Sequence, residues 1–295
     1  MSPTLRAGLM VTGGAVVISF AAIFARLAEV EPTTSAFYRM LFGTLGFGLL
    51  LLIDPRLRRG LGSGWLASLL IAICFTADLW FWHRSIDYIG PGLSTLLANF
   101  QVFVLTFVGV VWLKERISRR FAAGLSLAML GLWLLFGRDW SQLPPDARIG
   151  VALGLLTALA YGSYLLTLRA AQLRTPELRP ETRLLQVALY CTFMLGLINL
   201  AEGQSFVIPD TRSLLALVAL GLCCQVLGWV LIARGLPALA AAVVGLLLLL
   251  QPSLSIVWDM LIFGLRLEPV QFAGCALALI GIYLGFRAAN RGLDD

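Results

Sequence analysis

The sequence is divided into apolar runs of about 20 residues by short segments that contain charged residues, Pro and Gly. Because the hydrocarbon core of a bilayer is about 30 Å thick, a run of this length forms one membrane-spanning helix. Ten spans are expected, near residues 7–28, 34–53, 64–87, 91–113, 119–137, 148–170, 183–201, 212–235, 238–264 and 268–287. The expected fold class is an all-α polytopic membrane protein with ten transmembrane helices.

Composition and charge support this class. Hydrophobic residues make up 59% of the chain and charged residues 13%. The formal net charge of +6 does not indicate a nucleic-acid partner, because the basic residues lie in short segments between apolar runs and form no basic stripe. Most of the 22 Lys and Arg residues lie on the cytoplasmic side if the N-terminus is cytoplasmic. We therefore expect a multi-pass protein of the inner (plasma) membrane with both termini in the cytoplasm.

The second half of the sequence repeats the first at a constant offset of 150 residues. The polar matches carry most weight, since apolar identities between helices are common. The matching pairs are Cys74 and Cys224, Arg84 and Arg234, Gln101 and Gln251, Arg116 and Arg266, Gly124 and Gly274, Gly131 and Gly281, and Phe136 and Phe286. The chain thus divides into two five-span repeats, 1–144 and 145–295. Because five is odd, the second repeat enters the membrane inverted, as is typical of alternating-access transporters.

The segment after the fourth span carries a motif of known type. Residues 114–118 read Lys-Glu-Arg-Ile-Ser and precede a glycine-rich fifth span, and the second copy keeps Gly264, Arg266 and Pro269 but has Leu265 in place of the glutamate. These features resemble the paired helices of EamA-type members of the drug/metabolite transporter superfamily. Within it, the chain resembles the aromatic amino-acid exporters, the YddG-like proteins.

This resemblance implies both an architecture and an activity. Spans one to four and six to nine would enclose a central cavity, with spans five and ten supporting them from outside. The protein would export aromatic or other neutral amino acids, or similar small metabolites, by alternating access. Two alternatives stay open: a multidrug or other metabolite efflux transporter of the same superfamily, and a membrane scaffold without transport activity.

Asp78 is the most informative polar residue. It lies near the middle of the third span, where a carboxylate is costly unless it is paired, protonated or facing water, so a functional role is expected. The alternative is a buried pair with Arg39. Another face of the same helix carries Trp80, His83, Arg84 and Asp87. Substrate contact by Trp80 and His83 and a simple interfacial position are both compatible with this spacing.

Two further groups of residues are candidates. Polar and aromatic side chains expected to line the cavity, or else to pack between helices, are Tyr38, Asn99, Tyr161, Gln225 and Trp229. Residues expected to act as hinges or structural supports are Gly90, Pro91 and Gly92 at the outer hairpin, Gln101, Pro237 at the inner hairpin, Gln251 and Pro252.

An enzyme is not expected. His83, Ser85 and Asp87 stand two residues apart, and side chains at this spacing point to nearly opposite sides of a helix. The sequence contains no His-Glu-x-x-His, Gly-x-Ser-x-Gly or phosphate-binding glycine motif, and its five cysteines lack metal-ligand spacing. No cofactor or metal is therefore expected. The expected partners are a small-molecule substrate and the lipid bilayer.

Small residues recur at four-residue spacing in the fifth and tenth spans. The pairs are Gly124 with Ala128 and Gly281 with Gly285. This spacing lets helices approach closely, either within one chain or between two copies in a homodimer.

Overall fold

The computed structural model describes residues 2–58, 60–112, 114, 118–136, 147–264 and 268–291, with only the backbone for some of them, including 87, 90–92 and 259. Every regular element in these ranges is helical. The elements are α1 (Pro3–Ile18), α2 (Ala21–Leu27), α3 (Pro32–Ile53), η1 (Pro55–Arg58), α4 (Trp65–Ala98), α5 (Gln101–Val111), α6 (Arg119–Phe136), α7 (Ala147–Arg174), α8 (Pro180–Ala201), α9 (Thr211–Ala219), η3 (Leu220–Gly228), α10 (Trp229–Gly235), η4 (Leu236–Ala238), α11 (Ala241–Leu248), α12 (Leu250–Phe263) and α13 (Pro269–Arg291).

Seven helical segments within the described residues are long and apolar enough to cross a membrane. They are Pro3–Leu27, Pro32–Ile53, Trp65–Ile86, Ala147–Arg174, Pro180–Ala201, Thr211–Ala238 and Val243–Ile262. Two shorter apolar helices, Gln101–Val111 and Phe272–Leu284, accompany them. The all-helical, multi-pass expectation is confirmed for this part of the chain, whereas the number of ten spans stays a prediction. The Glu115–Ile117 part of the family motif, and Arg266, lie outside the described residues.

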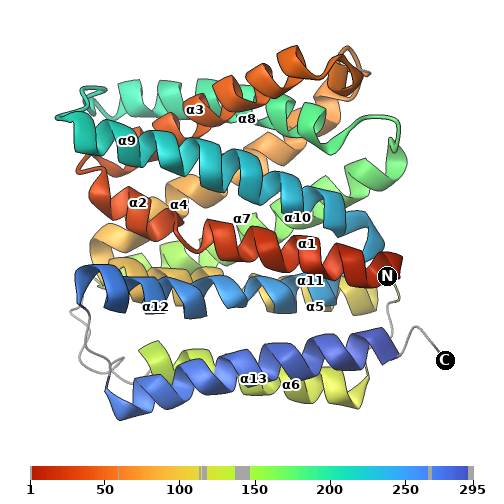
Figure 1. Cartoon of the computed structure of the whole chain (residues 1–295). Helices are drawn as coiled ribbons and strands as arrows, with labels where there is room; N and C mark the ends of the chain where they lie inside the picture. Colours follow the sequence, from red (N-terminus) through yellow and green to blue (C-terminus); the bar gives the residue numbers. More distant parts are fainter. Residues whose placement is uncertain are drawn as a thin grey trace.

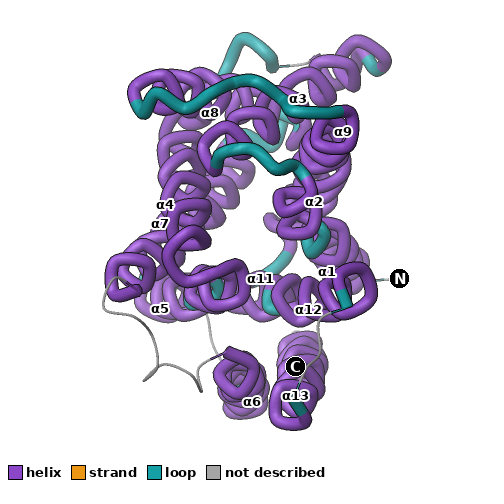
Figure 2. Tube along the Cα trace, turned by 90° about the vertical axis from the view of Figure 1, so that its left-hand side faces the viewer, coloured by secondary structure: helices purple, strands orange, loops and turns teal. Residues whose placement is uncertain are grey.

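Helices α6 and α13 form a separate pair on one side of the molecule (Figures 1 and 2). Their contact depends on glycine, because a Cβ atom at Gly131 would lie 2.4 Å from the Ala278 nitrogen. A Cβ at Gly281 would lie equally close, 2.4 Å, to the nitrogen of Ala128. These two contacts are related by the 150-residue offset of the sequence repeat. The small residues of both spans therefore pack against each other within one chain, and the homodimer stays a prediction.

Helix α4 reverses direction within its length. The Ser94 hydroxyl donates to the Ser85 hydroxyl at 2.8 Å, although nine residues of straight helix would separate them by about 13.5 Å. The Ser85 hydroxyl in turn donates to the backbone carbonyl of Gly150 at 2.8 Å, which fixes the bend against α7. The reversal thus lies between residues 85 and 94, where residues 90–92 were expected to form a hairpin. Their role as hinges stays a prediction.

Several spanning segments are interrupted near their middle. The helix breaks at residues 19–20 between α1 and α2, at 99–100 between α4 and α5, and at 249 between α11 and α12. Segment η3 is a π-helix, a rare form that is frequent at functional sites. In transporters, such breaks lie near the bilayer midplane, where freed backbone groups face a binding cavity.

The two ends of α8 define the two ends of the bundle. Glu181 lies in the first turn of α8, and Glu202 directly follows its last residue. Gly235 at the end of α10 packs against the backbone of Ala7 in α1, so the N-terminal helix begins at the Glu181 end. Helix α13 ends on this same side (Figure 1, right). We call the two sides the Glu181 end and the Glu202 end.

Candidate functional site

A cavity that is partly open to solvent lies where the interrupted helices meet. The residues that line it are Ile18, Ala21, Ala22, Arg39, Phe75, Asp78, Leu79, Trp82, Thr95, Ala98, Asn99, Thr157, Tyr161, Trp229, Gln251 and Ser255. Four of them are aromatic, and one cation and one carboxylate accompany the rings. We call this space the central cavity.

Arg39 and Asp78 are the charged residues of the central cavity. Both are deeply buried, with exposed fractions of 5% and 8%. The Arg39 Nε donates to the Gln225 carbonyl oxygen at 3.1 Å, and its guanidinium carbon lies 5.8 Å from the centre of the Phe75 ring. Among the described residues, none forms a hydrogen bond or an ion pair with the Asp78 carboxylate. Arg39 is therefore held by Gln225, while the Asp78 carboxylate remains available to a solute.

Three other predicted cavity residues join them. Asn99 lies at the break before α5, and its amide nitrogen donates to the Thr95 carbonyl at 2.7 Å, which leaves its own carbonyl oxygen for other contacts. The Tyr161 ring meets the Trp229 ring edge-on, with centroids 6.1 Å apart. The buried indole nitrogen of Trp229 has no hydrogen-bond partner within the described part of the chain. Because buried polar groups are normally satisfied, this donor is a candidate contact for a bound solute.

Four residues predicted for the cavity have other positions. They are Tyr38, Trp80, His83 and Gln225. Gln225 lies behind Arg39 on η3, and the Tyr38 hydroxyl donates to the Phe206 carbonyl at 2.7 Å at the Glu202 end. The Trp80 indole donates to the Glu202 carboxylate at 2.8 Å. His83 lines a second cavity, described below.

Three of the residues predicted as hinges or supports, Gln101, Gln251 and Pro252, lie directly after helix breaks. Gln251 and Pro252 form the first turn of α12, directly after the break, and Gln251 lines the central cavity. Pro237 lies in η4, the short turn that joins α10 to α11. Gln101 begins α5, is fully buried, and has no hydrogen-bond partner for either amide atom among the residues described. The matching sequence positions 101 and 251 thus both follow a break, at related points of the two repeats.

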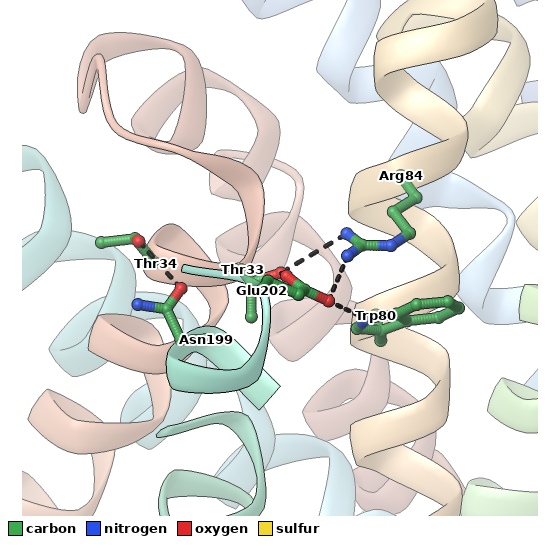
Figure 3. Close-up of polar contacts among 6 residues, drawn as sticks. All are labelled: Thr33, Thr34, Trp80, Arg84, Asn199 and Glu202. Carbon is green, nitrogen blue, oxygen red and sulfur yellow. Dashed lines mark hydrogen bonds and ion pairs between the residues drawn. The ribbon is translucent and has the colours of Figure 1, made fainter. Parts of the chain in front are cut away.

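The Glu202 end carries a compact polar cluster that sequence reasoning did not assemble (Figure 3). The Glu202 carboxylate accepts hydrogen bonds from the Thr33 hydroxyl at 2.7 Å and from the Trp80 indole at 2.8 Å, and it forms an ion pair with Arg84. The Arg84 guanidinium carbon lies 4.2 Å from the centre of the Trp80 ring. These four residues, Thr33, Trp80, Arg84 and Glu202, form what we call the Glu202 cluster.

The Glu202 cluster stabilises the ionised form of the Glu202 carboxylate relative to the protonated form. Partial burial by itself would raise the pKa of Glu202, but hydrogen bonds from Trp80, Thr33 and Arg84 and the charge of Arg84 outweigh it. The pKa of Glu202 is therefore lower than its ordinary value. The carboxylate thus links α3 and α4 to the end of α8 as a charged acceptor.

A related ion pair occupies the Glu181 end. Arg234, the repeat partner of Arg84, donates from its Nε to the Glu181 carboxylate at 2.7 Å and forms an ion pair with it. The Glu181 side chain is almost fully buried there, with an exposed fraction of 2%. Helix α8 therefore presents one acid at each end, about 31 Å apart along the helix, and each acid binds the arginine of a different repeat. The recurrence of Arg84 and Arg234 in the sequence was the signal that could have revealed this pairing.

Interrupted apolar helices around a buried cavity with charged and aromatic walls define the class of small-molecule transporters. Comparison of the sequence with known families agrees with this class. The chain matches the EamA-like transporter family twice, over residues 5–137 and 148–287. The chain belongs to the EamA-like transporter family, whose members move small molecules across membranes rather than act as enzymes.

The individual proteins that match this chain share only a small part of its sequence. The uncharacterized inner membrane transporter YhbE of Escherichia coli K12 is 27% identical over 148 residues, a match that covers 47% of this chain and 45% of that protein. The same figures hold for YhbE of E. coli O157:H7 and of Shigella flexneri. The match thus spans about half the length of these curated relatives. A solved crystal structure superposes with a TM-score of 0.82 over 97% of this chain and 98% of the other, at 18% identity, and so shares the fold.

Proposed function

We propose that the protein is an inner-membrane exporter of aromatic or other neutral amino acids, or of similar small metabolites. The observation that carries this proposal is the joint presence of Arg39, Asp78 and four aromatic rings around the central cavity. A zwitterion fits this lining, with its carboxylate toward Arg39 and its ammonium group toward Asp78. Its apolar side chain would pack against Phe75, Trp229 or their neighbours.

A lipophilic cation fits the same cavity less well. Asp78 would attract such a cation, but Arg39 adds a second positive charge within the same buried space, where charges interact strongly. The lining therefore favours a solute that carries both charges over a multidrug substrate. The aromatic amino-acid exporters of the superfamily, the YddG-like proteins, handle solutes of this kind, and we assign the chain to that branch as part of the proposal.

The proposed mechanism is alternating access between two inverted repeats of five helices each, 1–144 and 145–295. The topology has ten spans with both termini in the cytoplasm, so the Glu181 end is cytoplasmic and the Glu202 end is periplasmic. In the state open to the cytoplasm, the Glu181–Arg234 pair separates while the Glu202 cluster stays closed. In the state open to the periplasm, the opposite holds. The repeat-related arginines and the two ends of α8 support this scheme.

A flux assay tests the proposed function. Purified protein in liposomes is challenged with single radiolabelled amino acids and with a lipophilic cation. We expect counterflow of phenylalanine or tryptophan and none of the cation. Transport of the cation alone would identify a drug exporter, and no flux of any solute would favour a scaffold.

The Asp78→Asn variant tests the role of the cavity carboxylate. Because the ammonium group would lose its counter-charge, we expect flux to fall at least ten-fold, the factor that about 1.4 kcal/mol of lost stabilisation gives. Elution as a single peak in size-exclusion chromatography controls for folding. Unchanged flux in a folded Asp78→Asn protein would assign Asp78 to structure and remove the main support for a zwitterionic substrate.

A further inference from the structure

A second cavity, with about 600 Å³ of empty space, lies between the central cavity and the Glu202 end. Its walls come from α2, from the start of α3 and from α4 one turn beyond Leu79, which lines the central cavity. Ala22 lines both cavities, so the two spaces are neighbours along the bundle. We call the second space the outer chamber.

Two buried polar side chains that line the outer chamber each have one hydrogen-bonding atom without a partner among the described residues. His83 and Ser35 line the chamber with exposed fractions of 4% and 3%. Neither the His83 Nε2 nor the Ser35 hydroxyl has a hydrogen-bond partner in the described parts of the chain. Buried polar groups are normally satisfied, so two unsatisfied groups in one cavity point to a ligand that satisfies both.

The hydrogen bonding of His83 determines which chemical group this ligand must carry. Its Nδ1 lies 2.7 Å from the Leu79 carbonyl oxygen. A carbonyl only accepts hydrogen bonds, so Nδ1 carries the proton, and Nε2 of the neutral ring presents a lone pair. The Ser35 hydroxyl can also accept. The chamber therefore offers two acceptors to a donor group such as an ammonium or amine, whereas Arg26 on its wall supplies positive charge.

The remaining walls of the outer chamber are mostly apolar. Ala25, Val30 and Ile86 face the same space as His83 and Ser35. An apolar side chain attached to the amine can therefore be accommodated without leaving further polar groups unsatisfied.

We infer that the outer chamber is a second binding site on the exit path, in which His83 and Ser35 accept hydrogen bonds from the amino group of the transported solute. This inference rests on the proposed function, because it takes the solute to be an amino acid or a related amine. A solute leaving Asp78 would pass Ala22 and meet the two acceptors before it reaches the Glu202 cluster. The carboxylate of a zwitterion would then face Arg26.

Local thiol labelling tests the inference without a transport assay. Val30→Cys places a thiol on the chamber wall, in a protein whose five native cysteines are replaced by alanine or serine. Val207→Cys, on the exposed loop at the same end, is the matched control, since Val207 is 74% exposed and does not line the chamber. The labelling rate is measured with increasing phenylalanine, and separately with 3-phenylpropionate, which keeps the carboxylate but lacks the amine.

We expect phenylalanine to protect Val30→Cys and to leave Val207→Cys unprotected. In His83→Asn the amide replaces Nδ1–H toward Leu79 but removes the Nε2 acceptor. The half-protecting concentration of phenylalanine should then rise about ten-fold, the factor that about 1.4 kcal/mol of lost binding gives. Ser35→Ala should act in the same direction, and His83→Gln, which keeps an amide oxygen at the Nε2 position, should restore part of the protection. Neither His83→Asn nor Ser35→Ala should change any effect of 3-phenylpropionate.

Three results would overturn the inference. They are no protection of Val30→Cys by phenylalanine, protection that His83→Asn and Ser35→Ala leave unchanged, and an equal loss of protection for phenylalanine and 3-phenylpropionate. The Asp78→Asn variant separates this inference from the proposed function, because it should lose phenylalanine flux but keep protection in the chamber. Protection of Val30→Cys by phenylalanine, together with no phenylalanine flux through the wild-type protein, would contradict the proposed function and leave the chamber as an amino-acid binding site.

Discussion

The two ends of α8 are held in different ways. At the Glu202 end, contacts to α3 and α4 converge on one carboxylate that is about one-fifth exposed. At the Glu181 end, the acid is almost fully buried, and neighbouring residues of α8 form several bonds to the segment between α3 and α4 and to the start of α4. Thr182 donates to the Leu57 carbonyl, Arg183 to the Ser68 hydroxyl, and Gln186 to the Leu61 and Ser63 carbonyls, while the Ser68 hydroxyl donates to the Gln186 amide oxygen. The Glu202 end has further bonds as well, from Thr34 to Asn199 and the Ser205 carbonyl and from Tyr38 to the Phe206 carbonyl. The two ends therefore differ mainly in the burial of the acid, since Glu181 is 2% exposed and Glu202 is 20% exposed.

Because of this difference, the two ends should contribute differently to the stability of the fold and to transport. Removal of Arg234 would be costly although Arg234 is half-exposed, because the Glu181 carboxylate would stay buried without its partner. Both Arg84 and Glu202 are about one-fifth exposed, so the Glu202 cluster contributes less to folding and opens more easily. We therefore expect the Glu181 pair to matter most for the stability of the fold, and the Glu202 cluster to matter most for access to the cavity.

The largest expected effect comes from comparing the two repeat-related arginines. Arg234→Met leaves the Glu181 carboxylate buried without its partner and should lower the free energy of unfolding by about 1–3 kcal/mol, although Arg234 itself is 48% exposed. Arg84→Met should cost at most about 1 kcal/mol, because Glu202 is partly solvated and keeps Thr33 and Trp80. Unfolding in detergent, followed by circular dichroism, measures both. Equal losses would mean that the two ends do not differ in this way.

A double substitution sharpens this comparison. Glu181→Gln in the Arg234→Met protein removes the buried charge, so most of the lost stability should return. No recovery would show that Arg234 stabilises the fold by packing rather than through its ion pair.

An intermediate effect is expected on access from the Glu202 end. Glu202→Gln removes the charged acceptor that holds Arg84 and should favour the state open at this end. A thiol at Ala22→Cys, between the two cavities, should then react several-fold faster with a membrane-impermeant reagent added from the periplasmic side. Glu181→Gln is the control and should not accelerate this reaction. The comparison fails if both variants accelerate it equally.

The smallest expected effect concerns pH. Because the pKa of Glu202 is lowered on folding, its stabilising contribution is present above the ordinary value of about 4.5 and is lost as the pH falls through the lowered value. The stability difference between the wild type and Glu202→Gln should therefore be constant from pH 8 to about pH 5 and should vanish in more acidic solution. Thermal unfolding of both proteins across this range measures it. A difference that disappears already near neutral pH would contradict the assigned hydrogen bonds.

Sequence alone predicted the all-helical membrane fold because apolar runs of span length leave few alternatives. It could direct attention to Asp78 and Tyr161 because polar groups in such runs are rare. It could not assemble the Glu202 cluster, since Glu202 follows the end of a span and its partner Arg84 is 118 positions away in the chain. The contacts of Trp80 and His83 could not be predicted from the sequence either. Helical spacing shows which residues share a face, but it does not show which other helix that face contacts.

The central claim is that the Glu202 end must open for the solute to leave the central cavity. The most direct measurement is phenylalanine counterflow in liposomes by a Thr33→Cys/Glu202→Cys protein, before and after a reducible bifunctional thiol cross-linker, with the cross-linker-treated wild type as control. We expect cross-linking to abolish flux and reduction to restore it. Undiminished flux through the cross-linked protein would show that the Glu202 end does not need to open.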